Sequence, residues 1–97
     1  MNYINVGQIL SLHEMAIEMF GGSVGIRDQG RLEAAVASQH QEVFGVELYV
    51  DIFEKAAALL RGIIGDHPFA DGNKRTASLV AITLVEINDY VFTIKDG

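Results

Sequence analysis

The first pattern along the chain is that of an amphipathic helix with one buried stripe. Between residues 6 and 20, apolar residues and one histidine recur three or four positions apart. These positions are Val6, Ile9, Leu10, His13, Ile17 and Phe20. Asn5 can cap the start of this helix, and the pair Gly21-Gly22 can end it. The pattern therefore predicts a surface helix whose inner face, Phe20 included, packs against a core.

Two shorter elements are predicted between residues 28 and 49. Asp28 can cap an alanine-rich helix around Arg31 to Ser38. Gln41 to Tyr49 mixes apolar and polar residues around Gly45, which fits a small hairpin or an extended flap better than a helix. The chain is thus expected to have a short β flap beside its helices.

The second half of the chain predicts two strongly apolar helices. Asp51 and Glu54 have the spacing of a capping box, and the apolar positions after them mark a helix that ends near Gly65. Thr76 to Asn88 is apolar on nearly every side, which in a soluble protein indicates a central helix surrounded by others. Tyr90 to Ile94 is expected to form a brief strand. The fold class is therefore mainly all-α, a compact helical bundle with a central buried helix.

Length, composition and charge limit what this bundle can be. A chain of 97 residues fits one domain, residues 1–97, and its 49% hydrophobic and 21% charged residues are ordinary globular values. The absence of cysteine excludes disulfides and thiolate chemistry and suits a cytoplasmic location. A net charge of -6 argues against direct nucleic-acid binding. No secretory signal or membrane-spanning stretch is apparent, so we expect a soluble protein.

The run from His67 to Arg75 carries the candidate chemistry. It forms a loop between two predicted helices, and the first turn of a helix offers unpaired backbone N–H groups and a partial positive charge. Gly72 lets a phosphate approach the backbone, while Asn73, Lys74 and Arg75 stand at the helix start. Because cations at a helix N-terminus oppose the macrodipole, a bound anion explains Lys74 and Arg75 better than folding does.

Three further residues of the loop have predicted roles. Asp71 offers a hard oxygen ligand for Mg²⁺ beside a nucleotide's phosphates, although it can also serve as the helix N-cap. His67 is the candidate general base, and Phe69 is expected to point inward and fix the loop. His13 and His40 are more simply explained as caps or surface residues, and Arg27 and Arg31 as surface or loop contacts.

The loop closely resembles the signature of the Fic/Doc family, a His-x-Phe-x-Asp/Glu-Gly-Asn-x-Arg segment that binds nucleotide phosphates for transfer to a target-protein hydroxyl. The resemblance extends through Leu12-His13, Phe20-Gly21-Gly22, Gly25-Ile26-Arg27-Asp28 and Lys55-Ala56-Ala57, which points to the death-on-curing (Doc) branch. It implies a Fic-type helical bundle that uses ATP, or another nucleoside triphosphate, and Mg²⁺.

Two departures bear on which group is transferred. The AMP-transferring members usually have Gly where Lys74 stands and a second Arg where Ser78 stands. The Doc branch resembles enzymes that bind the nucleotide in a reversed orientation and transfer its terminal phosphate. The resemblance therefore implies a protein Ser/Thr kinase. An AMP or nucleotidyl transferase and a catalytically silent, antitoxin-binding fold remain as alternatives.

The resemblance also implies partners. The Doc toxin of bacteria phosphorylates a threonine of elongation factor Tu, which inhibits translation, and a small antitoxin neutralises it. The segment Gln41 to Tyr49 would be the flap that aligns the target peptide by strand addition. Members of the branch usually continue past the position of Gly97 with a further helix, so this chain is expected to lack it and to expose an apolar surface. A homo-oligomer or a bound antitoxin would cover that surface.

Overall fold

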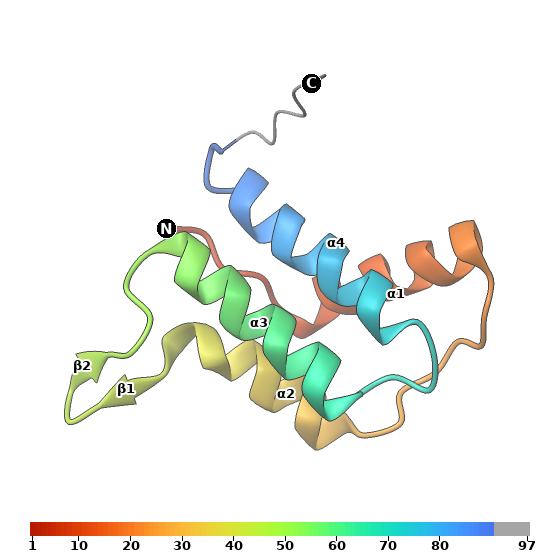
Figure 1. Cartoon of the computed structure of the whole chain (residues 1–97), viewed down its shortest axis with the longest axis horizontal. Coiled ribbons are helices and arrows are strands. Elements are labelled where there is room, and N and C mark those ends of the chain that lie inside the picture. The colour runs from red at the N-terminus through yellow and green to blue at the C-terminus, as the bar shows by residue number, and fades with distance from the viewer. Residues whose placement is uncertain (91–97) are drawn as a thin grey trace.

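The protein is a bundle of helices with one small hairpin at its side. In the computed structural model, residues 1–90 are described, and the predicted strand Tyr90 to Ile94 lies outside them except for Tyr90. The elements are α1 (Val6–Phe20), α2 (Gln29–Ala37), the 3-10 turn η1 (Ser38–His40), β1 (Glu42–Val43), β2 (Val46–Glu47), α3 (Ile52–Asp66) and α4 (Asn73–Glu86) (Figure 1). The predicted all-α fold class with a short β hairpin is confirmed.

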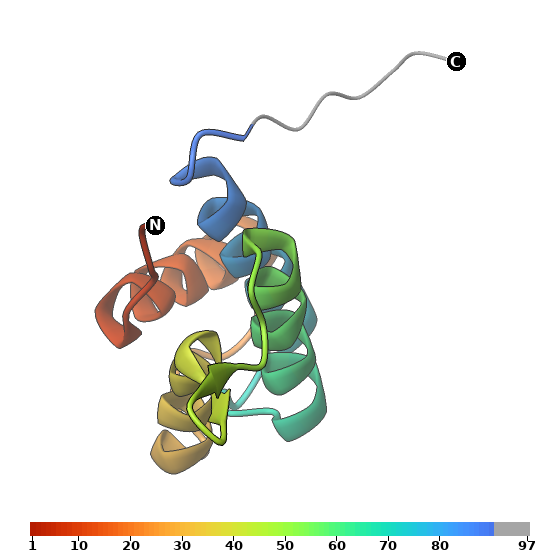
Figure 2. The same cartoon turned by 90° about the vertical axis from the view of Figure 1, so that its left-hand side faces the viewer.

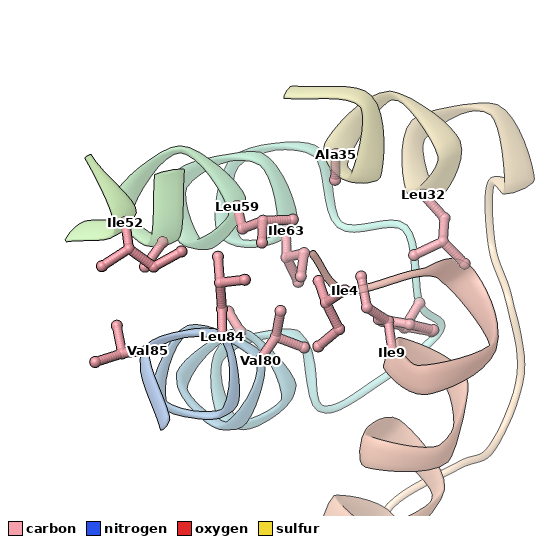
Figure 3. Packing of buried hydrophobic residues seen from close by; sticks show 13 residues of the cluster. Ile4, Ile9, Leu32, Ala35, Ile52, Leu59, Ile63, Val80, Leu84 and Val85 are labelled. Atoms are coloured by element: carbon pink, nitrogen blue, oxygen red, sulfur yellow. The ribbon is translucent and has the colours of Figure 1, made fainter. Parts of the chain in front are cut away.

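The core lies between α3 and α4, and α1 and α2 close its two sides. Leu59 and Ile63 of α3 face Val80 and Leu84 of α4, and all four are fully buried (Figure 3). Ile9 of α1 and Leu32 of α2 complete the same cluster. Because α3 and α4 form the most extensive helix contact, the loop that joins them is anchored at both ends by packed helices.

The helix boundaries follow the predicted signals, with one shift that matters for function. The side chains of Asn5, Asp28 and Asp51 cap α1, α2 and α3 as predicted. By contrast, α4 begins at Asn73, three residues before the predicted Thr76. Lys74 and Arg75 therefore belong to the first turn of the helix, whose backbone N–H groups have no partner within the helix.

The predicted hairpin exists, but it lies away from the motif loop and lines no part of its cavity, which disagrees with the predicted role of aligning a target peptide there. Val43 pairs with Val46 in antiparallel register around the tip residues Phe44 and Gly45. The hairpin is fastened to the start of α3, where the buried Lys55 ammonium contacts a Glu47 carboxylate oxygen at 3.1 Å. The motif loop follows the other end of that 15-residue helix, about 22 Å away by helical rise. Figure 1 shows the hairpin at one side of the molecule, away from this loop, and Figure 2 is viewed from that side, with the hairpin in front.

Two further predictions from the apolar pattern are only partly met. α4 is covered by α3 and α1, but its remaining side is open within residues 1–90, where Ile82 is 38% exposed. Phe20, predicted at the inner face of α1, is 53% exposed, because it occupies the last position of the helix, beyond the core. No helix within residues 1–90 is both long and apolar enough to span a bilayer.

Candidate functional site

The site is the loop of residues 67–72 together with the first turn of α4. His67 ends α3 in the left-handed conformation, with φ 48°, and Gly72 precedes α4 with φ 73°. A left-handed backbone suits Gly72, but it is uncommon for a side chain such as that of His67. The two reversals turn the chain sharply, so that His67 and the start of α4 face the same space.

The side chain of Asn73, at the start of α4, binds the backbone in the middle of the loop. Its amide oxygen accepts the Phe69 N–H at 3.0 Å, and its amide nitrogen donates to the Phe69 carbonyl at 3.0 Å. This reciprocal pair fixes the separation between the middle of the loop and the helix start. It also commits the Asn73 side chain to the loop, so that its backbone N–H is the group positioned to contact a phosphate.

Phe69 anchors the loop to the core, as predicted. Its side chain is 1% exposed, and its ring stacks on that of His13 with centroids 3.9 Å apart and planes 7° from parallel. His13 is itself buried, and its Nδ1 lies 3.0 Å from the Thr76 hydroxyl in the first turn of α4. His13 therefore occupies the buried stripe of α1, as the apolar spacing predicts, and it is neither a cap nor a surface residue. It joins α1, the loop and α4.

Burial also determines the charge state of His13. Desolvation lowers the pKa of this imidazole, and the negative charges of Glu14 and Asp71 oppose the shift. Its Nε2 has no hydrogen-bond partner among the described residues. A neutral ring tolerates that position, whereas a protonated one would bury an unpaired N–H. We infer that His13 is neutral when the loop is in this conformation.

The segment that follows α1 forms the outer wall of the loop (Figure 1). Ile26 pairs with Phe69 in an isolated antiparallel bridge, and the Ala70 N–H donates to the Gly25 carbonyl at 3.0 Å. The Ser23 N–H donates to Asp71 Oδ2 at 3.1 Å. A Cβ atom on Gly22 would lie 2.6 Å from that same oxygen. The carboxylate of Asp71 thus has a fixed orientation that depends on a glycine at position 22.

Two arginines hold the end of α3, which carries His67. Arg27 donates from Nε to the His67 carbonyl and from Nη2 to the Asp66 carbonyl, both at 2.7 Å. Arg31 donates to the same Asp66 carbonyl at 2.9 Å. Cations at a helix C-terminus satisfy its free carbonyls and complement the macrodipole. These loop contacts agree with the prediction for both arginines, and they brace the strained backbone of His67.

Six predicted site residues line one cavity of about 540 Å³. They are His67, Asp71, Gly72, Asn73, Lys74 and Arg75. Ala16, Ile17 and Gly21 of the α1 end form the opposite wall. A Cβ atom on Gly72 would come within 3.0 Å of Ile17, so glycine is required both for its φ angle and for this close approach.

The helix start in this cavity is prepared for an anion. No side chain in the described part of the chain caps α4, which leaves the N–H groups of its first turn directed at the cavity. Lys74 and Arg75 add two positive charges at the same place. In this structure the Arg75 guanidinium contacts Phe20, donating to the Phe20 carbonyl at 3.3 Å and lying 4.4 Å from its ring centroid. An anion in the cavity would draw Arg75 away from that contact.

The donor groups fit a metal ion that arrives with a nucleotide better than one held by protein alone. No group of three His, Asp or Glu side chains placed to hold a metal occurs within residues 1–90. Asp71 supplies the carboxylate in the cavity, and its Oδ1 accepts the Gly72 N–H at 2.8 Å. Mg²⁺ commonly takes one or two carboxylates and completes its shell with phosphate oxygens and water. The residues present therefore fit Mg²⁺ bound to nucleotide phosphates.

The contacts of four supporting residues were not predicted from the sequence, although a loop contact of unspecified partner was expected for Arg27. Gly22 and Ser23 orient Asp71, His13 stacks under the loop, and Arg27 holds the His67 carbonyl. Each contact joins residues 40 or more positions apart, so no local periodicity reveals it. The glycine-rich run after α1 is the one signal that suggests a close approach of backbone to another group.

Comparison with known proteins places the chain in a family. A family model described as the Fic/DOC family matches residues 3–85. The chain is 42% identical over 86 residues to a protein named Toxin Doc from Mycolicibacterium smegmatis, an alignment that covers 89% of this chain and 64% of that relative. It is 34% identical over 88 residues to Protein kinase doc of Escherichia phage P1, covering 91% of this chain and 69% of that relative.

The chain thus spans about two thirds of the length of these two relatives. The family match covers every residue of the cavity, from Ala16 to Arg75, and all of α1, α2 and α3. The resemblance first suggested by the loop residues is confirmed over residues 3–85: the chain belongs to the Fic/Doc family.

Proposed function

We propose that this protein is a Doc-type toxin that transfers the terminal phosphate of a nucleoside triphosphate to a serine or threonine hydroxyl of a target protein. One observation carries the proposal. An uncapped helix start with two cations, Lys74 and Arg75, shares a single cavity with Asp71 and the exposed His67. The names of the two relatives, a Doc toxin and a protein kinase, support this reaction class.

Different residues of the cavity would bind the phosphates and the metal ion. The first-turn N–H groups of α4 and the side chains of Lys74 and Arg75 would hold the phosphates and neutralise their charge. Asp71 would hold Mg²⁺, which when bound supplies positive charge to the phosphate oxygens and orients them. Asn73 and Phe69 keep these groups at fixed separations. Most of the catalytic effect expected for phosphoryl transfer comes from such positioning and charge stabilisation.

His67 would act on the acceptor. The hydroxyl oxygen of the target attacks the terminal phosphorus, its proton passes to an imidazole nitrogen of His67, and the bond from that phosphorus to the bridging oxygen breaks. The nucleoside diphosphate leaves with the electron pair of that bond. The left-handed backbone at His67, held by Arg27, directs the imidazole into the cavity instead of along α3.

The position of the label in ATP tests the proposal. The full chain is incubated with Mg²⁺, a bacterial lysate or purified elongation factor Tu, and ATP labelled at the γ or, separately, at the α phosphate. We expect protein-bound label from γ-labelled ATP only, with release of ADP. Label from the α position would instead show nucleotidyl transfer, the second candidate function. No label from either position would support a catalytically silent fold.

Two kinds of partner belong to the same proposal. Elongation factor Tu is the proposed target, because the family resemblance implies it. A small antitoxin is the proposed inhibitor, since one of the two relatives is named Toxin Doc. Among residues 1–90, an apolar groove of about 330 Å³ between α3 and α4 offers a surface for such a partner or for a second copy of the chain. The groove is lined by Phe53, Ala56, Ala57, Leu60, Ser78, Ala81, Ile82 and Val85.

An association of this kind is measurable without knowing the partner. We expect light scattering at micromolar concentration to give a mass above 10.6 kDa for the chain alone. Replacing the groove residue Ile82, which is 38% exposed, by Asp should reduce that mass to the monomer value, because a charge in an apolar interface is costly. A wild-type monomer that also binds no apolar dye would contradict the proposed interface.

A further inference from the structure

A second, mostly apolar cavity lies directly beside the phosphate cavity. It has a volume of about 290 Å³ and is lined by Phe20, Lys74, Arg75, Ser78 and Leu79. Lys74 and Arg75 line both cavities and so separate them. A ligand with a polyanionic part and a flat apolar part could fill both at once. A nucleoside triphosphate has this composition.

Phe20 is the aromatic side chain of this cavity, and its exposed ring adds nothing to the core. Its ring ends α1 with 53% of its surface exposed, although the pattern of the helix predicts it at the buried face. The only other large apolar group lining the cavity, among the described residues, is Leu79 on α4. An exposed aromatic ring beside a phosphate site is the usual platform on which a nucleobase stacks.

Arg75 connects the two cavities. Its guanidinium lies 4.4 Å from the centroid of the Phe20 ring and donates to the Phe20 carbonyl, so in this structure it covers part of the platform. Phosphate is a stronger partner for a guanidinium than one backbone carbonyl and an aromatic face. Phosphates in the first cavity would therefore draw Arg75 toward them and uncover Phe20 for the base.

We propose that Phe20, Ser78 and Leu79 form the site for the nucleobase of the nucleoside triphosphate. This inference rests on the proposed function, because it assigns the other half of the same ligand. With the nucleobase beside Phe20, the triphosphate runs from Arg75 along the first turn of α4 toward His67. His67 and Arg75 are the first and last residues of the loop and helix start that line the phosphate cavity. The terminal phosphate then reaches the general base, His67, and the phosphate attached to ribose stays near Arg75. This direction of the nucleotide is a reason for transfer of the terminal phosphate that does not depend on the comparison of Lys74 and Ser78 with the AMP-transferring members of the family.

Binding of ATP and of inorganic tripolyphosphate, each with Mg²⁺, tests the base site by calorimetry. Tripolyphosphate carries the same kind of anionic chain and no base. We expect the wild-type protein to bind ATP more tightly than tripolyphosphate. Phe20→Leu should weaken ATP binding about tenfold and leave tripolyphosphate binding within twofold, since it removes a stacking face and no cation. Phe20→Trp should bind ATP at least as tightly as the wild type.

A matched control is Met19→Leu, which changes an apolar side chain that is 65% exposed on the same turn and lines neither cavity. It should bind both ligands as the wild type does. An equal loss of affinity for ATP and for tripolyphosphate in Phe20→Leu would overturn the nucleobase site, because Phe20 would then act only through Arg75. Wild-type protein that binds ATP no better than tripolyphosphate would overturn the base site and leave phosphoryl transfer standing. Failure to bind either ligand would overturn both proposals.

Discussion

Replacing His67 by asparagine should lower the rate of transfer to a protein hydroxyl by about 10²- to 10⁴-fold, the usual contribution of a general base. Asparagine is the sharpest substitution at this position because it tolerates the left-handed backbone, φ 48°, that His67 adopts. It cannot accept the hydroxyl proton. The change therefore removes the chemistry and retains the turn between α3 and the loop.

Rate, nucleotide binding and stability must be measured together on this variant. ATP binding by calorimetry and the midpoint of thermal unfolding should both stay close to wild-type values, because the His67 side chain is exposed. His40→Asn is the matched control, since His40 is an exposed histidine on η1, away from the cavity, and lines no part of it. A His67→Asn protein that transfers phosphate within threefold of the wild-type rate would rule out His67 as the base.

The local character of the motif explains why so much of the site could be predicted from the sequence. His67, Asp71, Gly72, Lys74 and Arg75 lie within nine consecutive residues, so any sharp turn before a helix brings them to one place. The helices at either side were also predictable, because caps and apolar spacing are local signals. The start of α4 differs most from the prediction, by three residues, since no side chain within residues 1–90 caps it. The missing cap is itself part of the anion site.

Contacts between distant segments account for what the sequence did not reveal. The contact of Ser23 with Asp71 and that of Arg27 with His67 depend on how the segment after α1 crosses the loop, which no residue pattern encodes locally. The burial of His13 has the same origin, because a histidine in an apolar stripe gives no sign of its partners Phe69 and Thr76.

The position of the hairpin is the opposite case, because a local feature of the sequence, the length of α3, determines it. Its strands were predicted correctly from alternation around Gly45. Its distance from the motif follows from the helix between them, since the 15 residues of α3 carry the chain about 22 Å. A hairpin with strands of only two residues, attached at the start of α3, is too short to reach back to the loop at the other end of that helix. The segment that does lie along the loop is the extended stretch after α1, through Gly25 and Ile26.

The position of Phe69 leads to the largest expected effect on stability. Phe69→Ala should lower the free energy of unfolding by about 3–5 kcal/mol, the usual cost of truncating a buried phenylalanine. Its ring is 1% exposed and stacks on His13, so the truncation removes both core volume and an aromatic contact. For a domain of this size the loss is a large part of the total stability. Urea unfolding followed by circular dichroism should show a clearly lower midpoint.

Two companion variants separate the volume of Phe69 from its ring. Phe69→Leu should cost less than Phe69→Ala, because leucine fills most of the space but cannot stack on His13. Phe44→Ala, at the fully exposed hairpin tip, should leave the midpoint unchanged. An unchanged midpoint in Phe69→Ala would contradict the anchoring role of this residue. Asn73, at the start of α4, forms two hydrogen bonds with the Phe69 backbone. A loop that is less firmly packed would no longer hold Asp71 and the helix start at a fixed separation. We therefore also expect folded Phe69→Leu protein to bind ATP more weakly.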